Sequence, residues 1–429
     1  MKVLIIGGGG REHALAWKAA QSPQADIVYV APGNAGTELE RKVKNVPLSV
    51  DDKDGLVDFA CREKIELTIV GPEAPLVAGI VDAFQVAGLR CFGPSREAAI
   101  LEGSKSFTKE FLRRHRIPTA DYGVFSGITP ALDFIHHKGT PIVIKADGLA
   151  AGKGVFIAET KAEAGAVVHD ILGARSFGEA GQRIVIEEFL QGEEASFIVM
   201  TDGRHILPLA SSQDHKARDD GDRGPNTGGM GAYSPAPVVT PGVHERIMRE
   251  VIEPAVRGMA AENRTYTGFL YAGLMIGADG TPNVLEFNCR LGDPETQPVM
   301  MRLKSDLVDL CGAALDGELD DRQAFWDERA ALGVVLASRG YPEGASKGDV
   351  IYGLDTVFPD GIKVFHAGTG TTDGHVVTAG GRVLCVAALG ENVGVAQQAA
   401  YHAVKKIRWN GMFCRRDIGY RAIRREMNG

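Results

Sequence analysis

The chain has 429 residues, of which 44% are hydrophobic and 24% are charged, an ordinary balance for a globular protein. At roughly 150 residues per domain, this length predicts two to four domains rather than one hydrophobic core. Lys and Arg number 47 against 55 Asp and Glu, so the formal charge is -8. We therefore expect no nucleic-acid partner, and a phosphorylated substrate would need local cationic pockets.

The six cysteines are scattered and form no Cys-x-x-Cys pair, which argues against zinc and disulfides and favours a reducing compartment. Met1 and Lys2 lead directly into the strand-like run Val3–Ile6, without the apolar stretch and cleavage site of a signal peptide. No run approaches the roughly 18 apolar residues that span a bilayer. We expect a cytoplasmic enzyme without a membrane partner, either a monomer or a small homo-oligomer.

Residues 1–103 alternate short apolar strands with helices. Strands are expected at Val3–Ile6, Ile27–Val30, Leu67–Val70 and Leu89–Phe92, and helices at Glu12–Ala20 and Val77–Val86. Apolar runs separated by helices indicate a parallel sheet that is covered on both faces. We therefore predict an N-terminal doubly wound α/β domain.

Residues 104–326 read as an α+β region, in which a small lobe begins near Ile142. Ser104 can cap a helix at Lys105–His115. Strands are expected at Ile142–Lys145, Gly154–Ala158, Arg183–Glu188 and Ala195–Met200, a helix at Ala162–Leu172, a polar loop at Ser211–Gly231, a helix at Val243–Glu262, and a hairpin of Leu270–Ile276 and Asn283–Phe287. A loop of this length in a compact enzyme is usually functional.

Residues 327–429 are rich in β patterns and predict a small, separate C-terminal domain. Strands are expected at Leu332–Ser338, Gly348–Tyr352, Lys363–His366, Val376–Ala379 and Arg382–Leu389, followed by a helix at Val393–Lys406. No residue of this domain carries a recognisable catalytic pattern. We expect it to form a wall of the functional site.

Four glycines, Gly7–Gly10, follow the first strand and open the first helix, where free backbone amides favour an anion. A dinucleotide site is the first interpretation. However, Glu12 replaces the third glycine of G-x-G-x-x-G, and the second strand ends without an acid for a ribose. The run is either a tight strand–helix turn or, as the better functional interpretation, a site for a phosphate monoester.

A lysine–glycine loop runs from Lys145 to Gly154 between two strands. It is not a P-loop, because its glycine spacing is one residue short and Gly154 stands where Ser or Thr is required. A flexible glycine loop can still fold over phosphates and donate amides, with Lys145 as a fixed cation at the end of its strand. The alternative is a surface hairpin with solvated lysines.

Two later strands end in polar groups. Glu187–Leu190 and the following Glu194 can grip a purine and a ribose, although alone they are an ordinary strand end. Alternation along the last strand of this region puts Glu286, Asn288 and Arg290 on one face. Oxygen ligands for Mg²⁺ beside a guanidinium for a carboxylate explain that face better than a solvated edge strand does.

Polar residues also concentrate between Asp214 and Gly231, which is either a substrate loop or a disordered surface loop. His215 is not assigned as a general base, because phosphoryl transfer to a carboxylate needs none. Glu73 lies beyond the carboxyl end of the third strand, where α/β sheets bind ligands. It is placed to bond a sugar hydroxyl, or it simply lies in the first turn of a helix.

Taken in order, these segments resemble the ATP-grasp superfamily and, within it, are most similar to the glycinamide ribonucleotide synthetase family. The resemblance runs from residue 1 to about 420, on the runs Gly9–Ala14, Ala31–Gly36, Gly71–Leu76, Lys145–Gly154, Gly224–Gly231 and Arg290–Gln297. The last two runs are specific to the family. Lysine–glycine loops and Glu-x-Asn pairs occur throughout the superfamily.

The resemblance implies an ATP-grasp fold for residues 104–326 and a ligase that joins glycine to 5-phosphoribosylamine in purine biosynthesis. ATP would be cleaved to ADP and phosphate through a glycyl phosphate intermediate, with Mg²⁺ or Mn²⁺ as the metal. The ATP-grasp region would have two lobes, with the mobile lobe at about residues 120–190. Water would hydrolyse the intermediate, so the mobile lobe is expected to close over it.

The resemblance also assigns roles to individual residues. Catalytic roles fall to Arg290, Lys145 and Asp214, and metal ligation falls to Glu286 and Asn288. The ATP-binding set is Lys105, Lys145, Gly148, Gly152, Lys153, Gly154, Glu187, Glu188, Phe189, Leu190 and Glu194. The substrate-binding set is Gly9, Gly10, Asn34, Glu73, Asp214, Lys216, Thr227, Gly228, Gly229, Arg290, Gly292 and Asp293. Within it, Arg290 is expected to bind the glycine carboxylate and Asp214 to lie near the glycine amine.

One position departs from the superfamily pattern. Leu274 stands where many members place a further metal-binding acid, so additional ligands would be phosphates, water or Asp293. Three rival interpretations remain. Another ATP-grasp ligase, such as a biotin carboxylase, should lack the runs at 224–231 and 290–297. An NAD-dependent oxidoreductase should have the missing ribose acid, and a non-catalytic nucleotide sensor would not need Lys145, Glu286 and Asn288 together.

Overall fold

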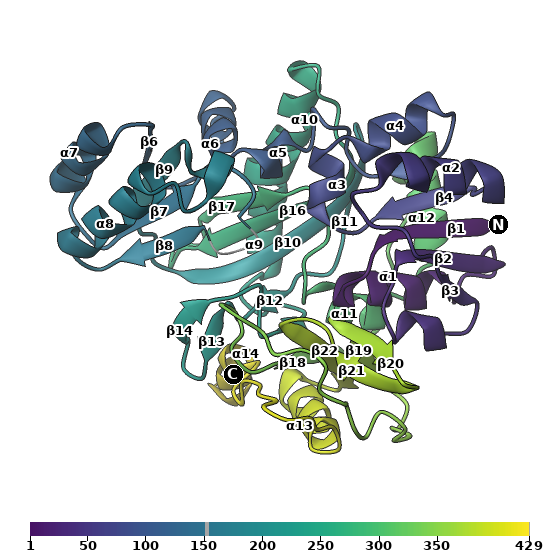
Figure 1. Ribbon diagram of the computed structural model, residues 1–429. Coiled ribbons are helices and arrows are strands. Elements are labelled where there is room, and N and C mark those ends of the chain that lie inside the picture. The colour runs from purple at the N-terminus through teal and green to yellow at the C-terminus, as the bar shows by residue number, and fades with distance from the viewer. Residues whose placement is uncertain (151–153, 429) are drawn as a thin grey trace.

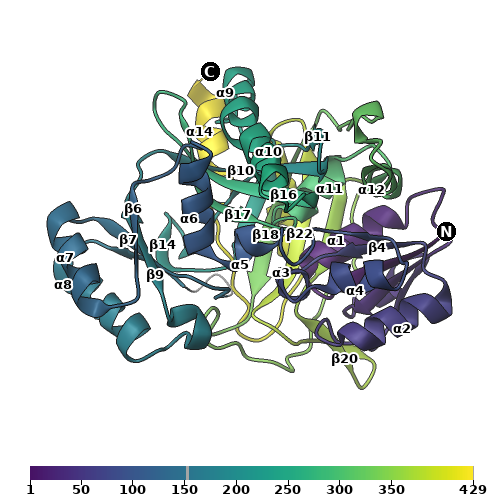
Figure 2. The ribbon, with the colours of Figure 1, turned by 90° about the horizontal axis from the view of Figure 1, so that it is seen from above.

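The computed structural model describes residues 1–150 and 154–428. The N-terminal sheet lies on one side of the molecule and a small four-stranded lobe on the other, with a central antiparallel sheet between them (Figures 1 and 2). In Figure 1 the C-terminal sheet lies below the central sheet. No helix in the described ranges is both long and apolar enough to cross a membrane.

The N-terminal sheet has five parallel strands in the order β3-β2-β1-β4-β5. Its elements are β1 (Lys2–Gly7), α1 (Gly10–Ala19), β2 (Ile27–Pro32), a 3-10 turn (Thr37–Leu39), β3 (Val43–Asn45), α2 (Lys53–Glu63), β4 (Leu67–Val70), α3 (Glu73–Val77), α4 (Ile80–Val86) and β5 (Cys91–Phe92). Leu4 and Ile6 of β1 pack into one hydrophobic core, and Val3 and Ile5 pack into another. Both faces of the sheet are therefore covered, which confirms the predicted doubly wound architecture.

One predicted helix of this domain is wrong in detail. Instead of a single helix over Val77–Val86, the chain forms α3 and α4 with a break at Gly79. Gly79 has a left-handed backbone (φ +85°), which is unstrained for glycine and interrupts the helix.

The lobe consists of the antiparallel sheet β6-β9-β7-β8 with two helices, as the left part of Figure 1 shows. Its elements, with the helices that lead into it, are α5 (Ile100–Gly103), α6 (Lys105–Arg114), β6 (Tyr122–Phe125), α7 (Ile128–Lys138), β7 (Ile142–Ala146), β8 (Val155–Ala158), α8 (Lys161–Val168), a π turn (His169–Gly173), a 3-10 turn (Gly178–Gly181) and β9 (Ile184–Glu188). Ser104 caps α6 as predicted, accepting from the Phe107 amide. The lobe has a hydrophobic core of its own, built around Ile144 and Ile186.

The central sheet has the order β11-β10-β16-β17 and is antiparallel. Its strands are β10 (Glu193–Asp202), β11 (Ile206–Pro208), β16 (Thr267–Ile276) and β17 (Pro282–Asn288). The adjoining helices are α9 (Pro241–Ile247), a π turn (Met248–Ile252), α10 (Glu253–Ala261), α11 (Thr296–Arg302), α12 (Leu307–Asp316) and a 3-10 turn (Leu319–Asp321). The predicted helix over 243–262 is thus a helical run that contains one wider turn.

The C-terminal sheet has the order β12-β15-β18-β22-β19. Its strands are β12 (Gln213–Asp214), β15 (Gly231–Ser234), β18 (Ala330–Ala337), β19 (Ile362–His366) and β22 (Arg382–Gly390), accompanied by the hairpins β13 (Ala217–Asp219) with β14 (Arg223–Asn226) and β20 (Thr369–Thr372) with β21 (His375–Thr378), and by α13 (Val393–Val404) and α14 (Tyr420–Asn428). The segment predicted as a loop over 211–231 therefore contains three short strands. Its first strand pairs with β15, and β15 pairs with β18 of the C-terminal region.

The strand predicted at Gly348–Tyr352 is wrong. Val350 and Tyr352 make only isolated bridges, to Val377 and Arg408. Gly348 and Gly353 both have positive φ angles of 88°, so the backbone turns at each end of the apolar run and no ladder extends.

Candidate active site

A cleft lies between the lobe, the central sheet and the 213–231 segment, and it encloses about 1670 Å³ of empty space, part of it open to solvent. Leu149, Ala150 and Gly154 of the lysine–glycine loop line it, and so do Glu286 and Asn288 of β17. The two segments expected to enclose a nucleotide thus face one cleft.

Two lysines share one buried carboxylate in the lobe. Glu187 of β9 pairs with Lys145 of β7 and with Lys109 of α6, and each side chain is at most 7% exposed. Burial raises the pKa of Glu187, but Lys145 and then Lys109 outweigh it and hold that pKa below its usual value. This Lys109–Glu187–Lys145 cluster carries one excess positive charge, which suits the phosphates of a nucleotide.

Lys145 also joins the lobe to the central sheet. In β17, Glu286 pairs with Gly273 while Val284 pairs with Leu274, so Leu285 between them is a bulge. A bulged residue is left out of the ladder. Its carbonyl accepts a hydrogen bond from Lys145 Nζ at 3.0 Å, which fixes this cation where lobe and sheet meet.

Asp147 anchors the beginning of the lysine–glycine loop. Its carboxylate accepts from the Ser106 amide (2.7 Å), from the Ser106 hydroxyl (2.8 Å) and from the Ser104 hydroxyl (3.1 Å), all at the start of α6. Lys105 Nζ donates to the Gly148 carbonyl at 2.9 Å, and burial lowers the pKa of Lys105. Gly148 contributes this carbonyl without lining the cleft.

Of the predicted ATP-binding residues, most line the cleft and two cannot be placed. Lys105, Lys145, Gly154, Glu187, Glu188, Phe189, Leu190 and Glu194 line it. Gly152 and Lys153 lie outside the described residues. Val143, Val155 and Met275 add apolar surface beside the strand end at 188–190. This half of the cleft offers apolar surface next to cations, as a purine nucleotide requires.

The predicted metal ligands Glu286 and Asn288 fit a hard divalent cation. They alternate on β17, and the Asn288 amide nitrogen lies 3.4 Å from Glu286 Oε1. Burial raises the pKa of Glu286, but neighbouring cations, of which Lys216 and Lys145 contribute most, bring it down to about 2. The carboxylate is therefore ionised and available for a metal.

The described residues hold no cluster of three or more His, Cys, Asp or Glu side chains suited to a metal. Leu274, which stands at the position of the further acid, is fully buried in the core. Phosphate and water oxygens would have to complete the coordination of a metal at Glu286 and Asn288.

Arg290 lies between two carboxylates. Its Nε donates to Glu73 at 3.0 Å and its Nη2 to Glu102 at 2.9 Å, while Nη1 donates to the Leu291 carbonyl at 3.2 Å. Burial raises the pKa of Glu102, and the attraction of Arg290 only partly offsets this. The contacts use three of the five guanidinium N–H donors. This Glu73–Arg290–Glu102 cluster holds the guanidinium rigidly and leaves the remaining donors for a ligand.

Asp214 is a half-buried residue whose carboxyl group has one buried oxygen, Oδ1, without a hydrogen-bond partner among the described residues. Burial, followed by repulsion from Glu295, raises the pKa of Asp214 well above its usual value. Glu295 itself accepts from Tyr271 and Ser196, each at 3.0 Å. Because an unpaired buried carboxylate is costly, a ligand with an ammonium group would complete this side of the cleft.

The glycine turn that was predicted to bind a phosphate is capped by Glu12, a residue of the helix that follows it. Glu12 Oε2 accepts a hydrogen bond from the Gly9 amide at 2.6 Å, so the residue that breaks the dinucleotide pattern satisfies the turn itself. Neither Gly9 nor Gly10 lines the cleft, although Asp293, which does, lies beside both glycines. Their position is next to the cleft rather than in its wall.

Asn34 also lies outside the cleft wall. Its amide nitrogen donates to the carbonyls of Gly8 and His366 at 2.9 Å each, and its oxygen accepts from the amides of Gly36 (2.9 Å) and Thr37 (3.0 Å). These bonds use both donors and the acceptor. In this structure Asn34 fixes a turn and connects the N-terminal domain with β19.

Most of the remaining predicted substrate residues line the cleft, and two of them are held by Arg382, which sequence reasoning missed. Glu73, Asp214, Lys216, Thr227, Gly228, Arg290, Gly292 and Asp293 line the cleft, whereas Gly229 packs behind it against Asp214. Arg382 of β22 donates to the carbonyls of Gly228 and Asp293 and pairs with the Asp293 carboxylate at 3.0 Å. The C-terminal region thus does more than form a wall.

Lys109, Glu102 and Glu295 were missed as well. Lys109 could have been found, because it follows Lys105 by four residues on a predicted helix and so shares its face. Glu295 lies inside a run already marked as family-specific. For Glu102 and Arg382 the sequence offers no pattern, because their partners lie far away along the chain.

Three family models of phosphoribosylglycinamide synthetase match consecutive parts of the chain. The N domain matches residues 1–102, the ATP-grasp (A) domain residues 103–296, and the C domain residues 331–421. The chain belongs to the phosphoribosylglycinamide synthetase family. The family resemblance drawn from the sequence is therefore confirmed.

Curated relatives agree over the full length. A phosphoribosylamine–glycine ligase of Allochromatium vinosum is 68% identical over 99% of this chain and 100% of its own. The enzyme of that name from Escherichia coli is 64% identical, with 100% of both chains covered.

Solved structures give the same fold. A crystal structure of phosphoribosylamine–glycine ligase from Thermotoga maritima matches with a TM-score of 0.83 at 35% identity, covering 97% of this chain and 100% of that one. A biotin carboxylase domain from Hydrogenobacter thermophilus, in complex with MgADP and bicarbonate, matches with a TM-score of 0.73 at 16% identity over 96% and 91% of the chains. This second likeness shows a shared ATP-grasp fold only.

Proposed function

We propose that this chain is an ATP-dependent ligase that joins glycine to 5-phosphoribosylamine, giving glycinamide ribonucleotide, ADP and phosphate, in de novo purine biosynthesis. The observation that carries the proposal is one cleft lined by two complementary charged groups. One is an excess-cation cluster, and the other is the unpaired Asp214 carboxylate. Relatives 64–68% identical over the whole chain bear the name of this enzyme.

In the first half-reaction, a glycine carboxylate oxygen attacks the γ-phosphorus of ATP, the bond to the β–γ bridging oxygen breaks, and ADP leaves. Lys145 and Lys105 hold the phosphates, so the charge that develops on the leaving group meets fixed cations. Glu188–Leu190 and Glu194 hold the base and the ribose. Catalysis here is positioning and charge neutralisation.

In the second half-reaction, the phosphoribosylamine nitrogen attacks the carbonyl carbon of glycyl phosphate and loses a proton, and phosphate leaves. Arg290 holds the former glycine carboxyl end through its remaining N–H donors, and Asp214 receives the glycine ammonium. Water competes with the amine, so closure of the lobe at about residues 120–190 over the cleft protects the intermediate.

Glu286 and Asn288 would hold Mg²⁺ or Mn²⁺ together with phosphate oxygens. When bound, the metal would supply charge neutralisation for the nucleotide phosphates. Lys216 lies 3.8 Å from Glu286 and 3.4 Å from Glu194, so its ammonium balances these carboxylates before ligands arrive.

The phosphoribosyl group is placed beside the N-terminal domain, against Glu73, Thr227–Gly229, Gly292 and Asp293. Gly9 and Gly10 border this end of the cleft. Asn34 acts here by fixing the adjoining turn. We assign these roles to three domains, at residues 1–103, 104–326 and 327–429.

We place the enzyme in the cytoplasm, acting on small molecules alone as a monomer or a small homo-oligomer. Purified protein should release ADP from Mg-ATP only when both glycine and phosphoribosylamine are present. Glycine labelled with heavy oxygen in its carboxylate should pass one labelled oxygen to the released phosphate, because the acyl phosphate is cleaved between carbon and oxygen.

Turnover with bicarbonate in place of glycine would instead indicate a carboxylase. Turnover with another amino acid would contradict the substrate assignment. Unlabelled phosphate would rule out the acyl phosphate.

A further inference from the structure

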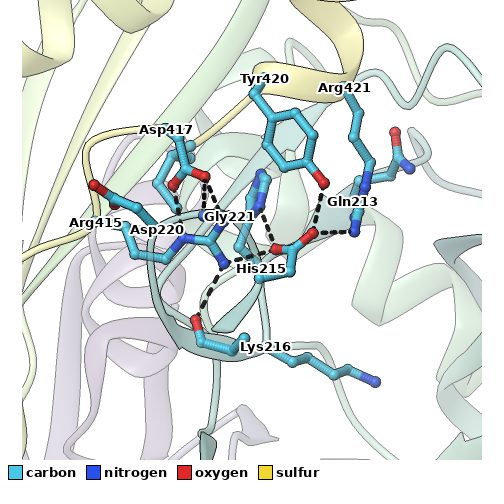
Figure 3. A network of polar contacts seen from close by, with 12 residues as sticks. Gln213, His215, Lys216, Asp220, Gly221, Arg415, Asp417, Tyr420 and Arg421 are labelled. Carbon is cyan, nitrogen blue, oxygen red and sulfur yellow. Dashed lines mark hydrogen bonds and ion pairs between the residues drawn. The ribbon is translucent and has the colours of Figure 1, made fainter. Parts of the chain in front are cut away.

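The C-terminal segment 415–421 packs against the back of the segment that carries Asp214 and Lys216 (Figure 3). That segment is intrinsically weak, because the hairpin β13–β14 has only two paired positions, Ala217 with Asn226 and Asp219 with Arg223. An isolated two-stranded hairpin is marginal in water. Its conformation must therefore be fixed from outside.

Arg415 supplies the main contact. Its side chain is fully buried and donates from Nη1 to the Ala217 carbonyl at 3.1 Å and to Asp222 Oδ1 at 2.8 Å. Its Nε and Nη2 form a two-bond pair with Asp417 at 2.8 and 2.9 Å. A buried guanidinium needs this full set of partners, and a planar fork meets them where a lysine would not.

Asp222, at the turn of the hairpin, is the matching acceptor. Its Oδ2 accepts from the Tyr420 hydroxyl and from Arg421, both at 2.5 Å. Two backbone amides complete the attachment: Gly221 donates to Asp417 at 2.8 Å, and Arg416 donates to Asp220 at 2.7 Å. The turn is therefore held by charged contacts on both of its sides.

His215 links this attachment to the cleft. Its Nε2 accepts a hydrogen bond from the Gly419 amide at 2.9 Å, and its Nδ1 lies 3.8 Å from Asp222. Asp214 and Lys216, its neighbours in the chain, line the cleft instead. Figure 3 shows Lys216 pointing away from the cluster into which His215 points. A shift of His215 would thus move both cleft residues.

We propose that Arg415 and Asp222 are positioning residues, through which the segment 415–421 sets the place of Asp214, Lys216 and 226–228 in the cleft. The inference rests on the proposed function, because it assigns these residues to the acceptor substrates. The ATP-side groups Lys105, Lys145 and Glu187 come from other elements and do not depend on this contact.

The test compares the steady-state kinetics of Asp222→Asn, Arg415→Ala and the mild variant Tyr420→Phe with wild type. We expect the KM for glycine and for phosphoribosylamine to rise by about tenfold or more in the first two variants and less in the third. The KM for ATP should rise clearly less, because Lys105, Lys145 and Glu187 keep their places and only the contacts of Lys216 with Glu194 and Glu286 are disturbed. Val404→Ala is the matched control, because Val404 belongs to the C-terminal core on α13 and its loss destabilises without touching the hairpin.

A second readout needs no substrate. Trypsin should cleave after Arg218 or Arg223 faster in Asp222→Asn and Tyr420→Phe than in wild type and in Val404→Ala. This readout also serves if Arg415→Ala fails to fold.

Unchanged glycine and phosphoribosylamine KM values in folded variants, or an equal rise in the ATP KM, would overturn the inference. So would cleavage at the wild-type rate. If wild-type protein itself shows no ligase activity, the proposed function fails, and the cleavage rates still decide whether the segment 415–421 holds the hairpin.

Discussion

Two clusters in the cleft are built from the same kinds of residue with opposite stoichiometry. In the Lys109–Glu187–Lys145 cluster two cations share one carboxylate, and in the Glu73–Arg290–Glu102 cluster two carboxylates share one cation. The first holds the pKa of its carboxylate below the usual value, whereas the pKa of Glu102 in the second is raised. Burial acts in the same direction on both, so the neighbouring charges make the difference.

The comparison separates two tasks. Excess positive charge attracts a mobile polyanion and stabilises charge that moves during phosphoryl transfer. Two carboxylates around one guanidinium instead fix its orientation, so that its remaining N–H donors have a defined direction. The first cluster thus attracts a ligand, and the second orients one.

Replacing the shared carboxylate of the first cluster should have the largest effect. Glu187→Gln leaves two buried lysines without their counter-ion, and we expect a loss of about 3–5 kcal/mol in the free energy of unfolding, measured by urea titration. Asp121→Asn is the control within the same lobe, since Asp121 pairs with Lys138 at the surface. It should cost at most about 1 kcal/mol. Similar losses in both variants would show that the buried cluster is not distinctive.

Replacing one lysine tests the excess charge directly. Lys145→Met keeps the Lys109–Glu187 pair but removes the cation that reaches β17, so kcat/KM for ATP should fall by about 100- to 1,000-fold. Lys109→Met should cost less, about tenfold, because Lys109 donates to the Thr119 hydroxyl, whereas Lys145 reaches the Leu285 carbonyl of β17. Equal losses would mean that total charge matters and the position of Lys145 does not.

Replacing the arginine tests orientation. Arg290→Ala should raise the KM for glycine by about tenfold or more while changing the KM for ATP by less than about threefold. Steady-state kinetics with each substrate varied in turn decide this. Equal loss for both substrates would refute the assignment of Arg290 to the glycine carboxylate.

The smallest expected effect is on stability as a function of pH, to which Glu102 and Glu187 contribute with opposite signs. The folded-state pKa of Glu102 lies above its usual 4.5, so its contribution to stability is present below that pH and is lost as pH rises. Glu187 behaves oppositely and loses its contribution as pH falls below 4.5. Relative to wild type, Glu102→Gln should therefore gain stability as pH rises from 4.5 towards the raised folded-state pKa of Glu102, by at most about 1.4 kcal/mol per pH unit. Urea unfolding at several pH values measures this, and a relative loss with rising pH would contradict it.

Much of the fold followed from local patterns. The strands at 3–6, 27–30, 67–70 and 142–145 are largely apolar runs, and each appears in the structure within two residues of its expected bounds. By contrast β3, with its polar Lys44 and Asn45, and the strands β12–β14 in the polar segment carry no such pattern. These short strands form because a neighbouring strand pairs with them by backbone hydrogen bonds. A short stretch of sequence does not reveal that pairing.

By itself the sequence determined the family, the parallel N-terminal sheet, and the placing of Lys145, Glu286, Asn288 and Arg290 around one cleft, because each lies in a short run whose spacing encodes its geometry. The tertiary structure decided which charges share a partner. Glu102 meets Arg290, Arg382 meets Asp293, and Arg415 meets Asp222 only after distant segments pack together. Charges interact through space, and separation along the chain does not predict that distance.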